Sequence, residues 1–307
     1  MKILIELPSW LGDSVMCSPA IENLISHFTN VDIILVGSFA STEVFKNHPN
    51  VIKTYKMNKK YRSFNVFSKE LGKFDYFFSF RSSLRSKVFK FFIKSKNKFQ
   101  YSKYKYQNEH QVEKYNRFVN DCLGENFCAL KLKVYKKNKP LSNSLTKVVG
   151  ISPGASYGDA KRWYPLEFAK LALSLSTTHE IIIFGGDQEK DIAYDIENFL
   201  IKKGVTNYQN LSGKTSITEL IELISGLDLF ITGDSGPMHI AASFAIPTVA
   251  IFGPTSENET SQWKNKNSII VKKSLDCQPC LKRICPLKHH NCMKLSLIHI
   301  SEPTRPY

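Results

Sequence analysis

The chain has 307 residues, of which 42% are hydrophobic, and it carries a formal net charge of +15. This length predicts about two domains, and the hydrophobic content excludes a globally disordered chain. The sequence contains no run of eighteen apolar residues, which argues against a membrane-spanning helix. Residues 2–7 run into a polar turn without a small-residue cleavage site, so we expect a cytoplasmic protein without a signal peptide.

The positive charge is concentrated in the first half of the chain. Residues 1–145 contain 25 Lys and Arg against 11 Asp and Glu, whereas residues 146–307 contain 17 against 16. Such an excess is either an ordinary solvated surface or a surface that meets an anionic partner. A nucleic acid, an anionic membrane and a phosphorylated glycolipid all fit the second alternative.

In the first half, short apolar segments alternate with helix-length segments, a pattern typical of parallel α/β layers. The predicted strands are residues 2–7, 32–37, 51–55 and 74–80. The predicted helices are residues 18–28, 61–71, 82–93 and 110–123. Residues 136–144 read KKNKPLSNS, which is polar and lacks an apolar period, so we predict a linker there.

A second alternation follows the linker. Its predicted strands are residues 147–152, 180–184, 227–232 and 248–252. Its predicted helices are residues 165–175, 188–203, 216–225 and 237–244. Ser216 and Glu219 have the spacing of a capping box at the start of the third helix. The whole pattern predicts an α/β protein with two Rossmann-like domains and a cleft between them, with ligands beyond the carboxyl ends of strands.

Glycine-containing turns follow four strands of the second half, with the sequences SPGASYG, FGGDQE, TGDSGP and FGPT. Glycine lets the backbone approach a phosphate closely, and the N–H groups of a helix N-terminus favour an anion. One such turn is common in α/β proteins, but four in one half indicate a nucleotide site. The dinucleotide pattern G-x-G-x-x-G does not follow the first strand, and the P-loop pattern is absent.

Asp13 is the first candidate catalytic residue. It follows the first predicted strand in the turn LPSWLGD, where a carboxylate could act as general base toward an acceptor hydroxyl. The alternative is that Asp13 only caps the next helix.

The segment TGDSGPMH contains the next candidates, Asp234, Ser235, Gly236 and His239. Ser235 and Gly236 could turn the backbone so that helix N–H groups point at a pyrophosphate. His239 could donate to a phosphate or a sugar hydroxyl, or it could be a structural histidine.

Two further candidates lie in the other turns. Lys161, in GDAKRWYP, could neutralise a diphosphate leaving group, or it could be one more of 42 basic residues. Glu189 could accept hydrogen bonds from ribose hydroxyls, or it could be an ordinary first-turn helix carboxylate.

Taken together, these motifs resemble the heptosyltransferases of glycosyltransferase family 9. LPSWLGDSVMCSPA, SPGASYGDAKRWYP, FGGDQE and TGDSGPMHIAA follow the family's order and spacing, and the resemblance covers roughly residues 1–294. It implies a GT-B fold with an interdomain cleft and an inverting transfer of heptose from ADP-heptose to the lipopolysaccharide inner core. It implies no cofactor and no metal bound by an Asp-x-Asp pair.

The resemblance also implies roles for domains and residues. Residues 1–140 would bind the acceptor, residues 147–275 would bind ADP-heptose, and residues 276–307 would form a cysteine-rich segment and an atypical tail. The implied base is Asp13. The implied donor contacts are Lys161 for phosphate, Glu189 for ribose, and the loop of Asp234, Ser235, Gly236 and His239.

The cysteine-rich segment contains Cys277, Cys280, Cys285 and Cys292 in the spacing C-x2-C-x4-C-x6-C. Four thiolates could bind zinc, but these spacings are not those of common zinc ribbons, and a compact thiol-rich loop is the alternative. We assign no metal to the segment. It resembles the segment typical of family members that add the second inner-core heptose, to a heptosyl-Kdo2-lipid A acceptor. The following LSLIHISEPTRPY does not resemble the family, so we expect a shortened, atypical tail.

A stretch of the first half interleaves basic and aromatic residues: Arg81, Arg85, Lys87, Phe89, Lys90, Phe91, Phe92, Lys94, Lys96, Lys98 and Phe99. Such a stretch could bind single-stranded nucleic acid, or it could be an amphipathic helix with phenylalanines inward and lysines outward. With the family resemblance, a phosphorylated lipid A–core acceptor and the anionic inner face of the inner membrane fit better.

We therefore expect ADP-heptose, the lipid A–core acceptor and a peripheral membrane contact as partners, and no nucleic acid. A transferase for the first heptose or for another sugar is the near alternative. A basic, zinc-containing nucleic-acid-binding protein is the alternative from a different class.

Overall fold

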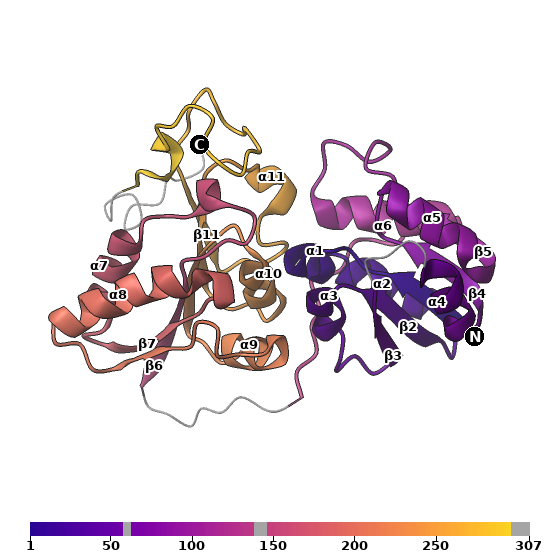
Figure 1. Ribbon diagram of the computed structural model, residues 1–307, viewed down its shortest axis with the longest axis horizontal. Helices are drawn as coiled ribbons and strands as arrows, with labels where there is room; N and C mark the ends of the chain where they lie inside the picture. Colours follow the sequence, from indigo (N-terminus) through magenta and orange to yellow (C-terminus); the bar gives the residue numbers. More distant parts are fainter. Residues whose placement is uncertain (58–62, 138–145, 296–307) are drawn as a thin grey trace. The chain divides into compact units, whose positions relative to one another are not determined.

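The computed structural model describes residues 1–57, 63–137 and 146–295, and the chain divides into two compact units, Met1–Lys137 and Asn138–Tyr307 (Figure 1). Most of the predicted linker and nearly all of the predicted atypical tail lie outside the described residues. None of the helices within the described ranges combines the length and the apolarity needed to cross a bilayer.

The first unit is built on a five-stranded parallel sheet with strand order β3-β2-β1-β4-β5. Its strands are β1 (Lys2–Glu6), β2 (Asp32–Gly37), β3 (Val51–Lys56), β4 (Lys73–Ser79) and β5 (Lys94–Gln100). The four predicted strands are confirmed within one residue at each end. The fifth strand, β5, was missed because its sequence KSKNKFQ has no apolar run; it is an edge strand, where lysines discourage pairing with another chain.

Helices α1 (Leu11–Met16), α2 (Ser18–His27), α3 (Phe39–Val44), α4 (Phe64–Leu71), α5 (Leu84–Phe92) and α6 (Gln111–Leu123) complete the first unit. Successive side chains of a strand point to opposite faces of its sheet. On β4, Phe77 contacts Phe89 of α5, whereas Phe78 contacts Phe118 of α6. Helices therefore cover both faces of the sheet, as the near-continuous apolar strands predict.

The interpretation of residues 81–99 as one basic-aromatic stretch needs a correction. The stretch is divided between helix α5 and edge strand β5, because Ile93 leaves the helical conformation and takes extended backbone. Phe89 points inward as expected and is fully buried. Phe91, however, is 79% exposed, so the prediction that the phenylalanines all face inward is wrong.

The second unit has a six-stranded parallel sheet with strand order β11-β10-β9-β6-β7-β8. Its strands are β6 (Lys147–Ser152), β7 (His179–Ile183), β8 (Tyr208–Asn210), β9 (Leu229–Gly233), β10 (Thr248–Phe252) and β11 (Ser268–Lys272). The two edge strands, β8 and β11, were not predicted, since each is short and flanked by polar residues. The four inner strands are confirmed.

The helices of the second unit are α7 (Pro165–Leu175), α8 (Lys190–Lys202), α9 (Ile217–Ile224), α10 (Gly236–Ser243) and α11 (Glu257–Thr260). The predicted capping box starts α9: the Glu219 N–H donates to Ser216 Oγ, and the Ser216 N–H donates to Glu219 Oε2 at 2.7 Å. A 3₁₀ turn, Asp159–Lys161, follows β6, and another, Asp187–Glu189, follows β7. Each unit is thus a parallel sheet with helices packed on it, and the predicted α/β class is confirmed.

Candidate functional site

The carboxyl ends of four adjacent strands of the second unit carry the candidate donor residues. The order β10-β9-β6-β7 places the turns after these strands side by side along one edge of the sheet. Neighbouring strands lie about 4.8 Å apart, so groups on successive turns can reach one ligand. Lys161 follows β6, Glu189 follows β7, and Asp234 follows β9.

Lys161 and Asp234 form a buried ion pair. The Lys161 Nζ lies 2.6 Å from Asp234 Oδ2, and the two side chains are only 12% and 5% exposed. The Thr255 hydroxyl, from the turn after β10, donates to the same carboxylate oxygen at 2.6 Å. Because Asp234 is held from two sides, it fixes the position of the Lys161 ammonium beside the start of α10.

The N-terminus of α10 offers backbone donors to an anion. Ser235 is the N-cap residue in extended conformation, but its side chain makes no capping hydrogen bond; its Oγ lies 3.1 Å from Thr232 Oγ1 instead. Gly236 begins the helix and Pro237 occupies its first turn, where a missing N–H costs nothing. The first-turn N–H groups of a helix lack carbonyl partners within it, and they favour a phosphate.

His239 lies in the first half of α10 and is 2% exposed. Its ring is therefore shielded from solvent. This burial favours the alternative of a histidine that supports the turn from within over one that projects into solvent.

Glu189 lies at the end of β7 and is 8% exposed. Its Oε2 accepts the N–H of Gly186 at 2.8 Å, so the carboxylate does act as a helix-end cap. The carboxylate also lies against Gly154, where an added Cβ would stand 2.1 Å from Glu189 Cδ. The absence of a side chain at Gly154 is what lets the carboxylate occupy this edge of the sheet.

The loop that carries Lys161 is anchored to the cysteine-rich segment. The Ala160 N–H donates to the Arg283 carbonyl at 3.0 Å, and His290 Nε2 donates to the Ala160 carbonyl at 3.0 Å. The Tyr157 hydroxyl donates to the Leu281 carbonyl at 2.7 Å. These contacts join residues more than a hundred positions apart, so the sequence pattern of either segment alone gave no sign of them.

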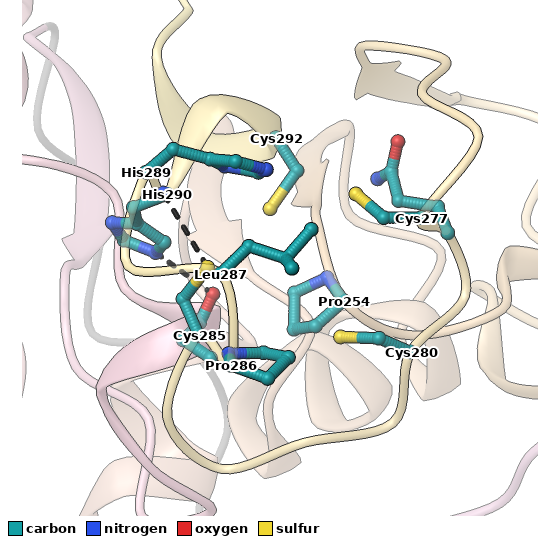
Figure 2. A pocket seen from close by; sticks show the side chains of 11 residues that line it. Pro254, Cys277, Cys280, Cys285, Pro286, Leu287, His289, His290 and Cys292 are labelled. Carbon is teal, nitrogen blue, oxygen red and sulfur yellow. Dashed lines mark hydrogen bonds between the residues drawn. The ribbon is translucent and has the colours of Figure 1, made fainter.

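The four cysteines of this segment line one cavity together with His289 and His290, as Figure 2 shows. Their thiols are free, and a backbone N–H bond from His290 lowers the pKa of Cys285 from its ordinary value. Within the described ranges no three Cys, His, Asp or Glu side chains are arranged to hold a metal ion.

Asp13 belongs to the first unit and lies in the first turn of α1, whose N-cap residue is Trp10. The alternative that Asp13 is the cap of this helix is therefore wrong. The Tyr115 hydroxyl, from α6, donates to the Asp13 carboxylate; burial and the charge of Asp13 raise the pKa of Tyr115 well above its ordinary value. Tyr115 thus stays protonated and orients the carboxylate.

The second unit brings Lys161, Asp234, Ser235, Gly236 and His239 together, and it places Glu189 on the same sheet edge. Sequence reasoning missed Thr255 and Tyr115. Thr255 follows the glycine of FGPT, one of the turns already singled out, and could have been suspected from it. Tyr115 had no local signal, since its partner Asp13 is distant in sequence.

The two parallel α/β units define the class of protein. The fold is that of GT-B glycosyltransferases. The structure of Escherichia coli ADP-heptose lipopolysaccharide heptosyltransferase II has a TM-score of 0.81 and 19% identity, over 98% of this chain and 96% of that chain. The E. coli heptosyltransferase WaaC with ADP-2-deoxy-2-fluoro heptose has a TM-score of 0.71 and 15% identity, over 89% of this chain and 94% of that chain.

Sequence comparison identifies the family. Residues 80–291 match glycosyltransferase family 9 (heptosyltransferase). Lipooligosaccharide heptosyltransferase 2 of Campylobacter jejuni is 44% identical over 301 residues, which cover 96% of this chain and 94% of that protein. The chain belongs to glycosyltransferase family 9 and is a glycosyltransferase, so the alternative of a zinc-containing nucleic-acid-binding protein is set aside.

Proposed function

We propose that this enzyme transfers L-glycero-D-manno-heptose from ADP-heptose to the heptosyl-Kdo2-lipid A inner core, with inversion at the anomeric carbon. The similarity to a lipooligosaccharide heptosyltransferase 2 over almost the whole chain supports addition of the second heptose rather than the first. Residues 1–140 would bind the acceptor and residues 147–275 the donor.

Asp13 would be the general base. As the acceptor hydroxyl oxygen bonds to the anomeric carbon, its proton passes to the Asp13 carboxylate, and the bond from that carbon to the ADP oxygen breaks. The hydrogen bond from Tyr115 would hold the Asp13 carboxylate in position for the acceptor hydroxyl. A positioned base of this kind contributes about 10²–10⁴-fold to the rate.

The observation that carries the donor proposal is the buried Lys161–Asp234 pair beside the start of α10. A free carboxylate would repel a diphosphate, so Asp234 would act by holding Lys161 in place. The ammonium has three donors and can turn one of them to the diphosphate oxygens while it keeps Asp234. Ser235 and Gly236 would present backbone N–H groups to the same oxygens, His239 would support the turn, and Glu189 would accept from ribose.

The exposed face of α5 supports a peripheral contact with the inner face of the inner membrane. Leu84 and Phe91 are 73% and 79% exposed, and Lys87 is exposed on the same side of the helix. Positions three and seven apart lie on one helix face, and an apolar face flanked by lysines suits an anionic lipid surface.

Replacement of the proposed base tests the mechanism. We expect Asp13→Asn to lower turnover about 10²–10⁴-fold, because the hydroxyl loses its proton acceptor, while ADP-heptose still binds. Mass spectrometry of heptosyl-Kdo2-lipid A incubated with ADP-heptose measures product, and calorimetry measures donor binding. Asp32→Asn, an exposed position of the same unit, is the matched control. Near-normal turnover by Asp13→Asn would rule out the assignment, and product formed from Kdo2-lipid A instead would indicate addition of the first heptose.

A further inference from the structure

Glu6 is a completely buried carboxylate that the proposed mechanism does not use. It is the last residue of β1, the central strand of the first sheet, and it is 0% exposed. Removing a carboxylate from water is costly, and such groups are retained where partners hold them or where they serve a function.

Both oxygens of Glu6 are bound by serines, one at the end of β4 and one in the first turn of α5. The Ser79 hydroxyl donates to Oε2 at 2.6 Å, and the Ser86 hydroxyl donates to Oε1 at 2.9 Å. Arg81 Nη1 lies 3.8 Å from Oε1, which makes an ion pair without a close hydrogen bond. The Arg85 charge also acts on Glu6, from the first turn of α5.

The backbone of Arg81 is held by hydrogen bonds, and its side chain is partly exposed. Its N–H donates to Ser79 Oγ at 3.4 Å, and its carbonyl accepts the Gln100 amide at 3.1 Å. The side chain is 18% exposed, whereas that of its partner Glu6 is 0% exposed. A guanidinium has five donors, and within the described part of the chain this one pairs with Glu6 at 3.8 Å, so donors can turn to a ligand.

Arg81 and Asp13 follow the carboxyl ends of two neighbouring strands, β4 and β1. Strands β1 and β4 are neighbours in the sheet, and the Phe80 N–H donates to the Glu6 carbonyl at 2.9 Å. The ring of Phe80 packs edge-on against Tyr115 with ring centres 5.4 Å apart, and Tyr115 is the residue that donates to Asp13. Arg81 therefore directly follows a residue whose ring packs against Tyr115.

We propose that Arg81 binds an anionic oxygen of the acceptor, a phosphate or a carboxylate, next to the hydroxyl that Asp13 deprotonates, and that Glu6 is the positioning residue that holds Arg81 there. This inference rests on the proposed function, because it assumes an anionic acceptor in the first unit. Arginine suits this role, since its planar fork matches both phosphate and carboxylate oxygens. The buried carboxylate orients the guanidinium from behind without reaching the ligand.

Kinetics of two variants that each remove one charge test the proposal. We expect Arg81→Gln and Glu6→Gln each to raise KM for the acceptor about 10- to 100-fold, the range for a lost hydrogen bond to a charged group, with KM for ADP-heptose unchanged. The double variant should be no worse than Arg81→Gln alone, because Glu6 acts only through Arg81. Lys94→Gln, an exposed position at the start of β5 with the same charge change as Arg81→Gln, is the control.

A normal acceptor KM for Glu6→Gln, or effects of the two changes that simply multiply, would overturn the positioning role. Thermal unfolding separates folding from function: a loss of acceptor affinity at an undiminished melting temperature supports the proposal, whereas loss of folding together with loss of both affinities contradicts it. Arg81→Lys should recover part of the acceptor affinity. If the Arg81→Gln defect persists on a dephosphorylated acceptor, the anion is a carboxylate; if it disappears, the anion is a phosphate.

Failure of the inference about Arg81 and Glu6 can be told apart from failure of the proposed function. Should the wild-type enzyme make no product from any heptosyl-Kdo2-lipid A acceptor, the proposed function itself fails. Should the wild type be active and Asp13→Asn inactive while Arg81→Gln is normal, only the inference about Arg81 and Glu6 fails.

Discussion

At the scale of single residues, the two buried carboxylates Asp234 and Glu6 are stabilised in different ways. Asp234 has a close ammonium partner, Lys161, and a hydroxyl donor. Glu6 has two hydroxyl donors, but its nearest cation stands 3.8 Å away. Burial therefore dominates at Glu6 and raises its pKa above the ordinary value of 4.5. A carboxylate left in this condition costs stability, which proteins accept mainly where function requires it.

The raised pKa of Glu6 predicts a pH-dependent stability. A carboxyl group whose pKa is higher in the folded than in the unfolded chain destabilises the fold when ionised, so this cost is fully present above the raised pKa and disappears as the pH falls through it. Glu6→Gln lacks this titration. At pH 7 to 8 we expect the variant to melt at a temperature equal to or above that of wild type. Toward pH 4 the melting temperature of wild type should rise relative to that of the variant.

Melting temperatures of both proteins across this pH range make the measurement. The control is Glu43→Gln, an acidic position of the same unit that forms an ion pair with Lys46 near the surface. A difference between wild type and Glu6→Gln that stays constant with pH would show that the buried carboxylate does not titrate as expected.

The candidate site residues could be predicted from the sequence because they follow strands in short motifs. Lys161, Asp234, Ser235 and Gly236 were found from the glycine turns. Their partners were not, because the contacts that fix them come from distant segments: Asp234 pairs with a lysine 73 positions earlier. A pattern of local spacing carries no information on such pairs. The same limit hid the Glu6 cluster, in which a glutamate at the end of an apolar strand looked unremarkable.

At the scale of elements, the inner strands were predictable, whereas the edge strands β5, β8 and β11 were not; the edge strand β3 was predicted. Inner strands of a parallel sheet are buried on both faces and show as continuous apolar runs. An edge strand has one open side, and β5 (KSKNKFQ) and β8 (YQN) accordingly lack an apolar run, while the apolar run of β11 (SIIVK) is short. Helix starts with a local chemical signal, such as the Ser216–Glu219 box, were located within a residue or two. The helices α1 and α3 are too short to show a helical apolar period, and they were not predicted.

The loop after β6 gives a prediction at this scale. Gly158 has φ of 152°, and an added Cβ would stand 2.5 Å from the Arg283 carbonyl oxygen. Gly158→Ala should therefore push the Lys161 loop away from the cysteine-rich segment. We expect at least about 10-fold weaker ADP binding by calorimetry, because the ammonium loses its fixed position.

Gly204→Ala is the matched control for Gly158→Ala. Gly204 also has positive φ, at 73°, but an added Cβ there meets no atom within 4 Å. It should cost only the backbone strain of about 1 kcal/mol and leave ADP affinity unchanged. Equal ADP affinities for the two variants would contradict a role of the loop contact in donor binding.

At the scale of the whole molecule, the net positive charge lies almost entirely in the half of the chain that is proposed to bind the acceptor. The balance of +14 in residues 1–145 against +1 in residues 146–307 places the excess on the unit proposed to meet an anionic glycolipid and the membrane. Part of this charge has a structural role as well, since Lys96 of edge strand β5 pairs with Asp75 at 2.8 Å. The sequence predicted the imbalance and the family, but it could not show which lysines protect a sheet edge.

Membrane association can be measured directly. We expect the protein to cosediment with vesicles that contain anionic phosphatidylglycerol, and salt should weaken this binding because exposed charges are screened. Phe91→Ser should reduce it several-fold, since an exposed apolar side chain no longer enters the interface. Ile201→Ser on α8, which removes a 57% exposed isoleucine from the second unit, is the control. Unchanged binding by Phe91→Ser, or binding indifferent to salt, would count against this surface.

The hydrogen bond between His290 and Ala160 joins positions 130 residues apart. During synthesis, the lysine next to Ala160 emerges from the ribosome long before the histidine that secures its loop. A nascent chain that has completed the inner strands of its second sheet therefore still lacks the hydrogen bond that holds the loop of its proposed nucleotide site. If the loop of Lys161 binds the sugar donor as proposed, we expect this ability to be acquired late in translation, after the thiol-rich loop has folded back.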